Sequence, residues 1–194
     1  MNKISVSEIL DFSGCLDDED PNDTFHKSYY YFLKYFSQKD VITEEDLIIG
    51  ANFTYGWMPT MMRFKSEDFE LSVSILNKAK SEIRISSQEL MVLKGLINNS
   101  LVGASKLLHF INPEKYAIWD SRVCNFLVGK SYKYIVEKID LYWEYLDLCE
   151  RVSKDPHFLS IHDNFSKVIN YKVYPFRTIE QIMFINSSTP IAKF

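Results

Sequence analysis

Residues 96–110 read LINNSLVGASKLLHF, and residues 117–123 read AIWDSRV. Asparagine and serine favour turns and caps over helix interiors, so the Asn-Asn-Ser run at 98–100 predicts the end of one helix. The apolar spacing after it predicts a second helix that begins near Gly103 and carries Lys106 in its first turn. The first stretch therefore predicts two helices joined by a tight, glycine-bearing turn.

The second stretch predicts a third helix. Asp120 is a strong N-cap candidate for a helix that runs through Leu127, and Gly129 is a C-terminal stop. Apolar spacing, caps and prolines predict the other helices, with about nine or ten in all. Six of these helices are expected at about residues 5–12, 24–36, 43–56, 131–152, 157–169 and 176–185. Two more are expected to begin at Ser66 and at the capping box of residues 86–89.

No stretch predicts a strand, so the fold class is all-α. The chain has 194 residues, 46% of them hydrophobic and 15% aromatic, and only 6 Gly and 6 Pro. This length and composition suit one compact helical domain over residues 1–194. The alternative is two helical lobes, at about residues 1–85 and 86–194, flanking a cleft.

Several classes of protein are not expected. No apolar run reaches the roughly 18 residues of a membrane span, and Glu8 precedes any signal-like apolar stretch. Cys15, Cys124 and Cys149 lack CxxC spacing, and the four histidines lack metal-ligand spacing. We therefore expect no disulfide framework, no metal, no cofactor and a reducing, cytoplasmic location. Cys124 follows Arg122 closely, which would suit a thiol of lowered pKa, but its place on an apolar helix face favours the core.

Charge is distributed unevenly along the chain. The net charge is −4, yet residues 1–70 carry 6 basic and 14 acidic side chains, whereas residues 71–194 carry 16 basic and 12 acidic ones. Residues 94–133 alone carry 6 basic and 2 acidic side chains. The front of the chain would repel a polyanion, and the middle would tolerate one.

The order helix, turn, helix with Lys106, then Asp120 followed by Ser-Arg-Val resembles the helix-hairpin-helix DNA glycosylases. The similarity covers about 30 residues, and the helical background and chain length agree with that family. The resemblance implies a DNA base-excision glycosylase or AP lyase in which Lys106 and Asp120 are catalytic. It implies DNA as the partner and a helix-hairpin-helix element that grips a phosphate.

Each residue then has an expected role. The amides of Gly103, Ala104 and Ser105 would meet a DNA phosphate at a helix N-terminus. Asp120 would stabilise positive charge on the sugar, and Lys106 would attack it.

Further residues would bind the DNA around the reacting sugar. Arg122 would contact phosphate, unless it pairs with Glu114. A flipped nucleotide would stack on Trp57, Trp119 or Tyr55.

Structural explanations compete with these roles. Asp120 would serve as a helix cap in any case, Gly103 would permit a tight turn, and a lone lysine is usually solvated. The second hypothesis is accordingly a non-catalytic helical binding or interaction protein that keeps the scaffold. A homodimer is also compatible with the sequence, because the aromatic residues of the first helices could form its interface.

Overall fold

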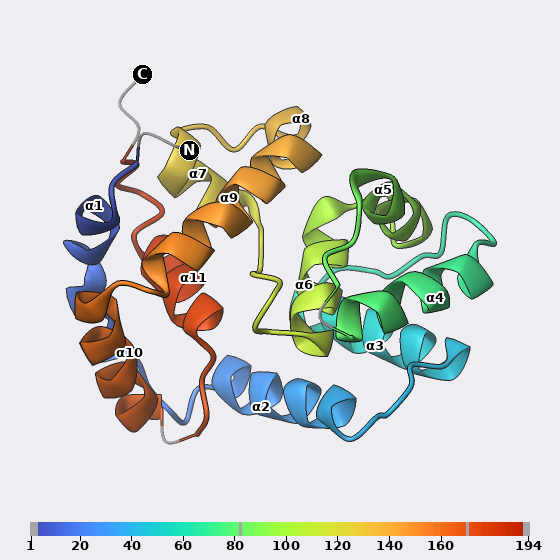
Figure 1. Cartoon of the computed structure of the whole chain (residues 1–194), viewed down its shortest axis with the longest axis horizontal. Helices are drawn as coiled ribbons and strands as arrows, with labels where there is room; N and C mark the ends of the chain where they lie inside the picture. Colours follow the sequence, from blue (N-terminus) through green and yellow to red (C-terminus); the bar gives the residue numbers. More distant parts are fainter. Residues whose placement is uncertain (1–3, 82, 170, 192–194) are drawn as a thin grey trace. The chain divides into compact units, whose positions relative to one another are not determined.

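The computed structural model describes residues 4–81, 83–169 and 171–191, in which helices are joined by loops (Figure 1). The prediction of an all-α chain is confirmed. Within the described residues, the strand-like pairing consists of one isolated antiparallel bridge between Phe64 and Ile97. No described helix combines the length and apolarity that crossing a membrane requires.

The chain divides into two compact units. The central unit is Thr24–Tyr116, and the terminal unit contains the residues up to Asp23 and those from Ala117 onward. Residues 85 and 86, where the alternative of two lobes would divide the chain, lie inside the central unit. The physical reason is that α4 (Phe69–Lys80) packs against both α5 (Ser87–Leu96) and α6 (Leu101–Ile111), so no boundary separates them.

The central unit is built around α6. This helix contacts α4 and α5, and also α2 (Thr24–Ser37) and α3 (Glu44–Trp57) (Figure 1). Nine of its eleven residues are buried, so it forms the core of the unit. The prominence of small and apolar residues in this segment explains why four helices can pack on it.

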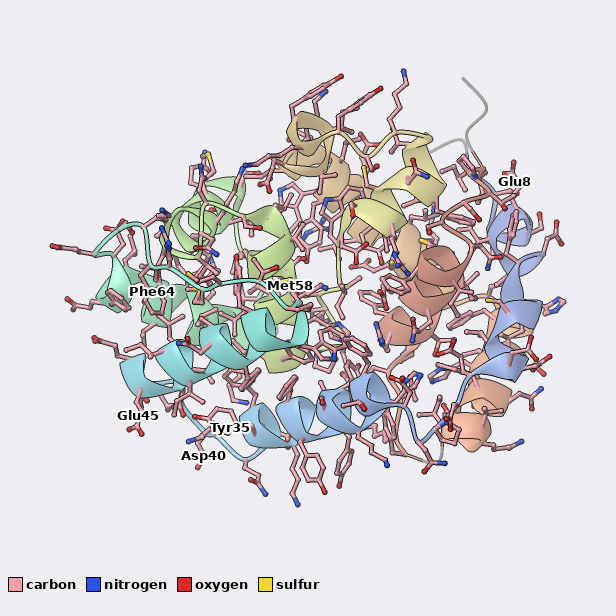
Figure 2. The ribbon with its side chains drawn as sticks, turned by 180° about the vertical axis from the view of Figure 1, so that it is seen from behind. Glu8, Tyr35, Asp40, Glu45, Met58 and Phe64 are labelled. Atoms are coloured by element: carbon pink, nitrogen blue, oxygen red, sulfur yellow. The ribbon has the colours of Figure 1, made fainter. Side chains whose placement is uncertain are left out.

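The start of α3 is fixed by local chemistry (Figure 2 shows Tyr35 and Glu45 near it). Thr43 and Asp46 form a reciprocal capping box, and Asp46 also accepts from Tyr35 at 2.7 Å and pairs with Lys39 at 2.7 Å. Burial opposes the ionisation of Asp46, but these bonds outweigh it and hold the pKa of its carboxyl well below the usual range. The expected capping box at the start of α5 is confirmed, because Ser86 and Glu89 each accept from the other's backbone N–H.

The terminal unit is built around α11 (Pro175–Ile185). Five other elements contact it: α1 (Val6–Leu10), the 3₁₀ helix η1 (Ser13–Asp18), α7 (Ser121–Val128), α9 (Ile139–Val152) and α10 (Pro156–Ile169). Its residues from Phe176 to Met183 are all buried, including four polar ones. Among these, Arg177 and Glu180 form an ion pair one turn apart, and Thr178 bonds His162 at 2.7 Å. Pairing lets a central helix carry polar side chains, because an unpaired buried charge is costly.

Two expected helices differ from the observed ones. Residues 131–152 form a short helix α8 (Lys133–Val136) and the separate α9, because the backbone at Lys138 is extended, with φ −79° and ψ 114°. The Val136 carbonyl at the end of α8 accepts from the Trp119 indole at 2.7 Å. The α4 helix begins after Asp68, with no side-chain cap, instead of after Ser66.

Candidate functional site

The turn between α5 and α6 is made by asparagines. Asn98 and Asn99 have φ values of 55° and 51°, which asparagine tolerates better than most residues. The Asn98 side chain also accepts from the Arg63 amide at 2.8 Å and donates to the Met61 carbonyl at 2.9 Å. These bonds tie the turn to the segment between α3 and α4, on which Met58 and Phe64 are labelled in Figure 2. The two helices thus form a hairpin that is fixed by side-chain bonds.

Gly103 lies in the first turn of α6, beyond the hairpin turn. A Cβ at this position would lie 2.3 Å from the Tyr55 hydroxyl oxygen and 2.7 Å from two ring carbons. The glycine is therefore required by the close approach of Tyr55, whose hydroxyl donates to the Ile97 carbonyl at 3.3 Å. The glycine-bearing turn predicted from sequence is corrected: asparagines make the turn, and Gly103 makes room for an aromatic ring.

Two of the three amides expected to grip a phosphate, those of Gly103 and Ala104, donate to Ser100. The Gly103 N–H donates to the Ser100 hydroxyl at 3.2 Å, and the Ala104 N–H donates to the Ser100 carbonyl at 3.1 Å. Ser105 is buried, and its hydroxyl donates to the Val102 carbonyl at 3.0 Å. Ser100 thus caps α6 and uses the donors that a phosphate would otherwise accept from.

Lys106 and Trp57 are brought together. The Lys106 Nζ lies 5.1 Å from the centroid of the Trp57 ring, a cation–π geometry, and both side chains are partly exposed. Trp57 is the last residue of α3, and Lys106 lies one turn into α6, so the packing of α3 on α6 sets this pair. Further rings surround the indole, with centroids 5.5–6.3 Å away: Phe25, Tyr29 and Phe110.

Sequence reasoning missed the role of His109, one turn beyond Lys106. His109 is buried, and its Nδ1 lies 2.6 Å from the Tyr116 carbonyl oxygen, which can only accept a hydrogen bond. Nδ1 therefore donates. In a neutral ring, Nε2 then accepts from the Tyr29 hydroxyl at 2.8 Å. These two hydrogen bonds connect Tyr29, which packs against Trp57, to Tyr116 at the end of the central unit. The helical spacing of three residues between Lys106 and His109 was the sequence signal that could have identified His109.

Asp120 and Arg122 lie in the terminal unit, at the start of α7. The Asp120 carboxylate accepts from the amides of Arg122 at 2.9 Å and Val123 at 3.0 Å, so its expected capping role is confirmed. Gly129 ends α7 with a φ of 70°, also as predicted. Arg122 is exposed, and its guanidinium carbon lies 4.4 Å from the Phe184 ring centroid.

Trp119 and Cys124 belong to the core of the terminal unit. Trp119 is 0% exposed and its indole N–H is bonded to Val136, so its ring offers no free face to a base. The expectation that Trp119 supplies stacking surface is corrected for this reason. Burial, with the Asp120 carboxylate nearby, raises the pKa of the Cys124 thiol to about 11, and the interpretation of Cys124 as a core residue is confirmed.

The predicted residues thus fall into two groups, each placed within its own unit. Gly103, Lys106 and Trp57 gather on the packed α3 and α6 helices of the central unit. Asp120 and Arg122 begin α7 of the terminal unit, and their convergence with Lys106 stays a prediction. Among the described residues, no group of three or more His, Cys, Asp or Glu side chains is placed to hold a metal ion.

Comparison with known proteins gives no match: no family model, no curated protein and no solved structure is similar to this chain.

Proposed function

We propose that this protein is a DNA base-excision glycosylase or AP lyase in which Lys106 is the nucleophile. The observation that carries the proposal is the Lys106–Trp57 pair. It places an amine 5.1 Å from the centroid of a partly exposed indole, beside the α5–α6 hairpin. An aromatic face can hold an extruded nucleotide by stacking, and an amine beside that face can reach its sugar.

The reaction would proceed in ordered steps. A target nucleotide leaves the duplex and stacks against Trp57. The bond between base and sugar breaks as the Lys106 nitrogen forms a bond to the sugar C1′, and the departing base takes the electron pair. Positive charge that develops on the sugar is stabilised by the Asp120 carboxylate. Loss of a proton from nitrogen and opening of the sugar ring give a Schiff base, from which β-elimination cleaves the strand.

Two requirements follow from the surroundings of Lys106. The indole face attracts the ammonium form, so the amine must leave the ring and lose its proton before it attacks. Displacement by a stacking base would accomplish the first step, because a base and the ammonium compete for one face of Trp57. Stacking of the nucleotide on Trp57 would thus also release the Lys106 amine for attack.

A non-catalytic helical binding or interaction protein that keeps the scaffold is the second candidate. Specific observations favour it: the Asp120 carboxylate already accepts two backbone bonds, and Ser100 takes the Gly103 and Ala104 donors. A carboxylate has about four lone-pair sites, so capping and charge stabilisation are compatible. The two candidates differ in whether a covalent bond forms.

Borohydride trapping on duplex DNA with an abasic site separates the candidates. The wild type is expected to give a covalent adduct, and Lys106→Arg is expected to abolish it, because a guanidinium keeps the charge but cannot form a Schiff base. Lys115→Arg is the matched control on an exposed lysine of the same unit. No adduct with wild type, or an adduct that survives Lys106→Arg, would exclude Lys106 as the nucleophile.

Asp120→Asn tests the role of the carboxylate. Asparagine is also a good N-cap, so α7 is retained while the charge is lost. We expect base excision to fall by a factor of about 100 or more, as for loss of a preorganised electrostatic group. Adduct formation on an abasic site, which needs no base departure, should change far less. Equal loss of both steps, or of neither, would contradict this role.

A further inference from the structure

The segment between α7 and α9 carries two exposed tyrosines with parallel rings. Tyr132 and Tyr134, here called the tyrosine platform, are 62% and 67% exposed. Their ring planes differ by 5°, and their centroids lie 5.9 Å apart. By contrast, Tyr142 and Tyr145 of the same unit are fully buried. The platform therefore presents aromatic surface that the fold does not use.

The backbone of the platform is anchored at both ends. Before it, the Cys124 thiol donates to the Lys130 carbonyl at 3.3 Å. After it, the buried Trp119 indole donates to the Val136 carbonyl at 2.7 Å. Because both donors are core side chains of the terminal unit, the segment is held in place before any ligand arrives, which lowers the entropic cost of binding.

The segment that carries the platform, residues 129–138, is basic. Lys130, Lys133 and Lys138 are exposed, and Glu137 is the single acid in residues 129–138. The chain as a whole has a net charge of −4, so this positive charge is a local feature. Alternating lysines and aromatic rings match a strand in which phosphates alternate with bases.

We propose that the tyrosine platform binds unpaired nucleotides of a nucleic-acid strand. Each ring offers one face on which a base can stack, and the lysines on either side meet the phosphates. A protein partner fits less well, because lysine is depleted in protein interfaces and two rings supply little of the roughly 800 Å² that a stable partner covers. This inference goes beyond the proposed reaction, since it concerns the terminal unit and needs neither Lys106 nor a covalent step.

Fluorescence anisotropy with a labelled oligothymidylate of about 15 nucleotides tests the platform on the full chain. The double substitution Tyr132→Ala/Tyr134→Ala is expected to weaken binding at least about tenfold, because each stacked base contributes about 1–3 kcal/mol. Tyr132→Phe/Tyr134→Phe should stay within about twofold of wild type, since stacking needs the ring and not the hydroxyl. Circular dichroism confirms that these surface variants are folded.

The chain supplies a matched control in a second pair of exposed tyrosines. Tyr30 and Tyr31 on α2 are 39% and 64% exposed, but their rings meet edge to face at 73°. Tyr30→Ala/Tyr31→Ala is expected to leave the affinity for the oligothymidylate within about twofold of wild type. An equal loss in this control would show that general surface aromaticity, and not the platform, binds the strand.

Salt dependence tests the lysines independently. Lys130→Gln/Lys133→Gln should weaken binding and reduce the slope of log affinity against log salt by about 0.7 for each lost phosphate contact. The proposal is overturned if wild type does not bind the oligothymidylate at low ionic strength, or if the alanine pair binds it as wild type does. The probe has no abasic site and no borohydride is present, so failure here is distinct from failure of the Lys106 proposal.

Discussion

Replacement of Gly103 by alanine tests whether this glycine serves packing. The added Cβ would lie 2.3 Å from the Tyr55 hydroxyl oxygen, whereas non-bonded heavy atoms prefer about 3.5 Å or more. The ring must therefore retreat by about 1 Å. Tyr55 is 2% exposed and its hydroxyl bonds Ile97, so it has little room to do so. The clash is between buried groups that are both fixed by other contacts.

The magnitude follows from two opposing effects. Overpacking of a filled core costs about 1–3 kcal/mol, and Gly→Ala within a helix gains about 0.5–1 kcal/mol. We expect Gly103→Ala to lower the free energy of unfolding by about 1–2 kcal/mol. Gly95→Ala in α5 is the matched control, because nothing lies within 4 Å of its Cβ position. That variant should gain about 0.5–1 kcal/mol, so the two substitutions are expected to differ in sign.

Urea unfolding followed by circular dichroism measures both variants, and a double-mutant cycle isolates the clash. In a Tyr55→Leu background the smaller side chain leaves space, and Gly103→Ala should then cost less than in the wild type, with a coupling energy of about 0.5 kcal/mol or more. If Gly103→Ala were as stabilising as Gly95→Ala, the close approach of Tyr55 would be refuted.

Two further predictions concern buried polar groups of the central unit. Asp46→Asn should lower the free energy of unfolding by about 1–3 kcal/mol at pH 7, because it removes the charge that pairs with Lys39. The pKa of Asp46 is lowered in the folded state, so its contribution to stability is present above the unfolded pKa of about 3.9 and is lost as the pH falls. Urea unfolding should therefore give free energies for wild type and Asp46→Asn that differ at pH 7 and converge in acid. An equal difference at pH 7 and in acid would contradict this reasoning. Tyr29→Phe should cost about 1–3 kcal/mol in the same assay, because the buried His109 Nε2 loses its donor. A stability unchanged from wild type would show that this bond is not formed in solution.

Several helix ends and caps of this protein were predictable from sequence. The capping box of Ser86 and Glu89, the Asp120 cap of α7 and the Gly129 stop all depend on residues within three or four positions of each other. Such signals are local, so neighbouring residues are sufficient to recognise them. The same locality explains why the all-α fold class could be predicted.

Packing partners were decided by the tertiary structure. The sequence offered Trp57 and Trp119 as equivalent stacking residues, but one is partly exposed beside Lys106 and the other is buried with its N–H on Val136. The break between α8 and α9 was likewise not predicted from any local pattern.

Sequence by itself determined which segments become helices and where most of them start. The tertiary structure decided why Gly103 is a glycine, because the ring that requires it comes from α3. It also decided which tyrosines stay exposed: Tyr132 and Tyr134 lie at the surface, whereas Tyr142 and Tyr145 are buried. The physical reason is that a cap is an interaction between near neighbours in the chain, whereas burial depends on residues brought together only by folding.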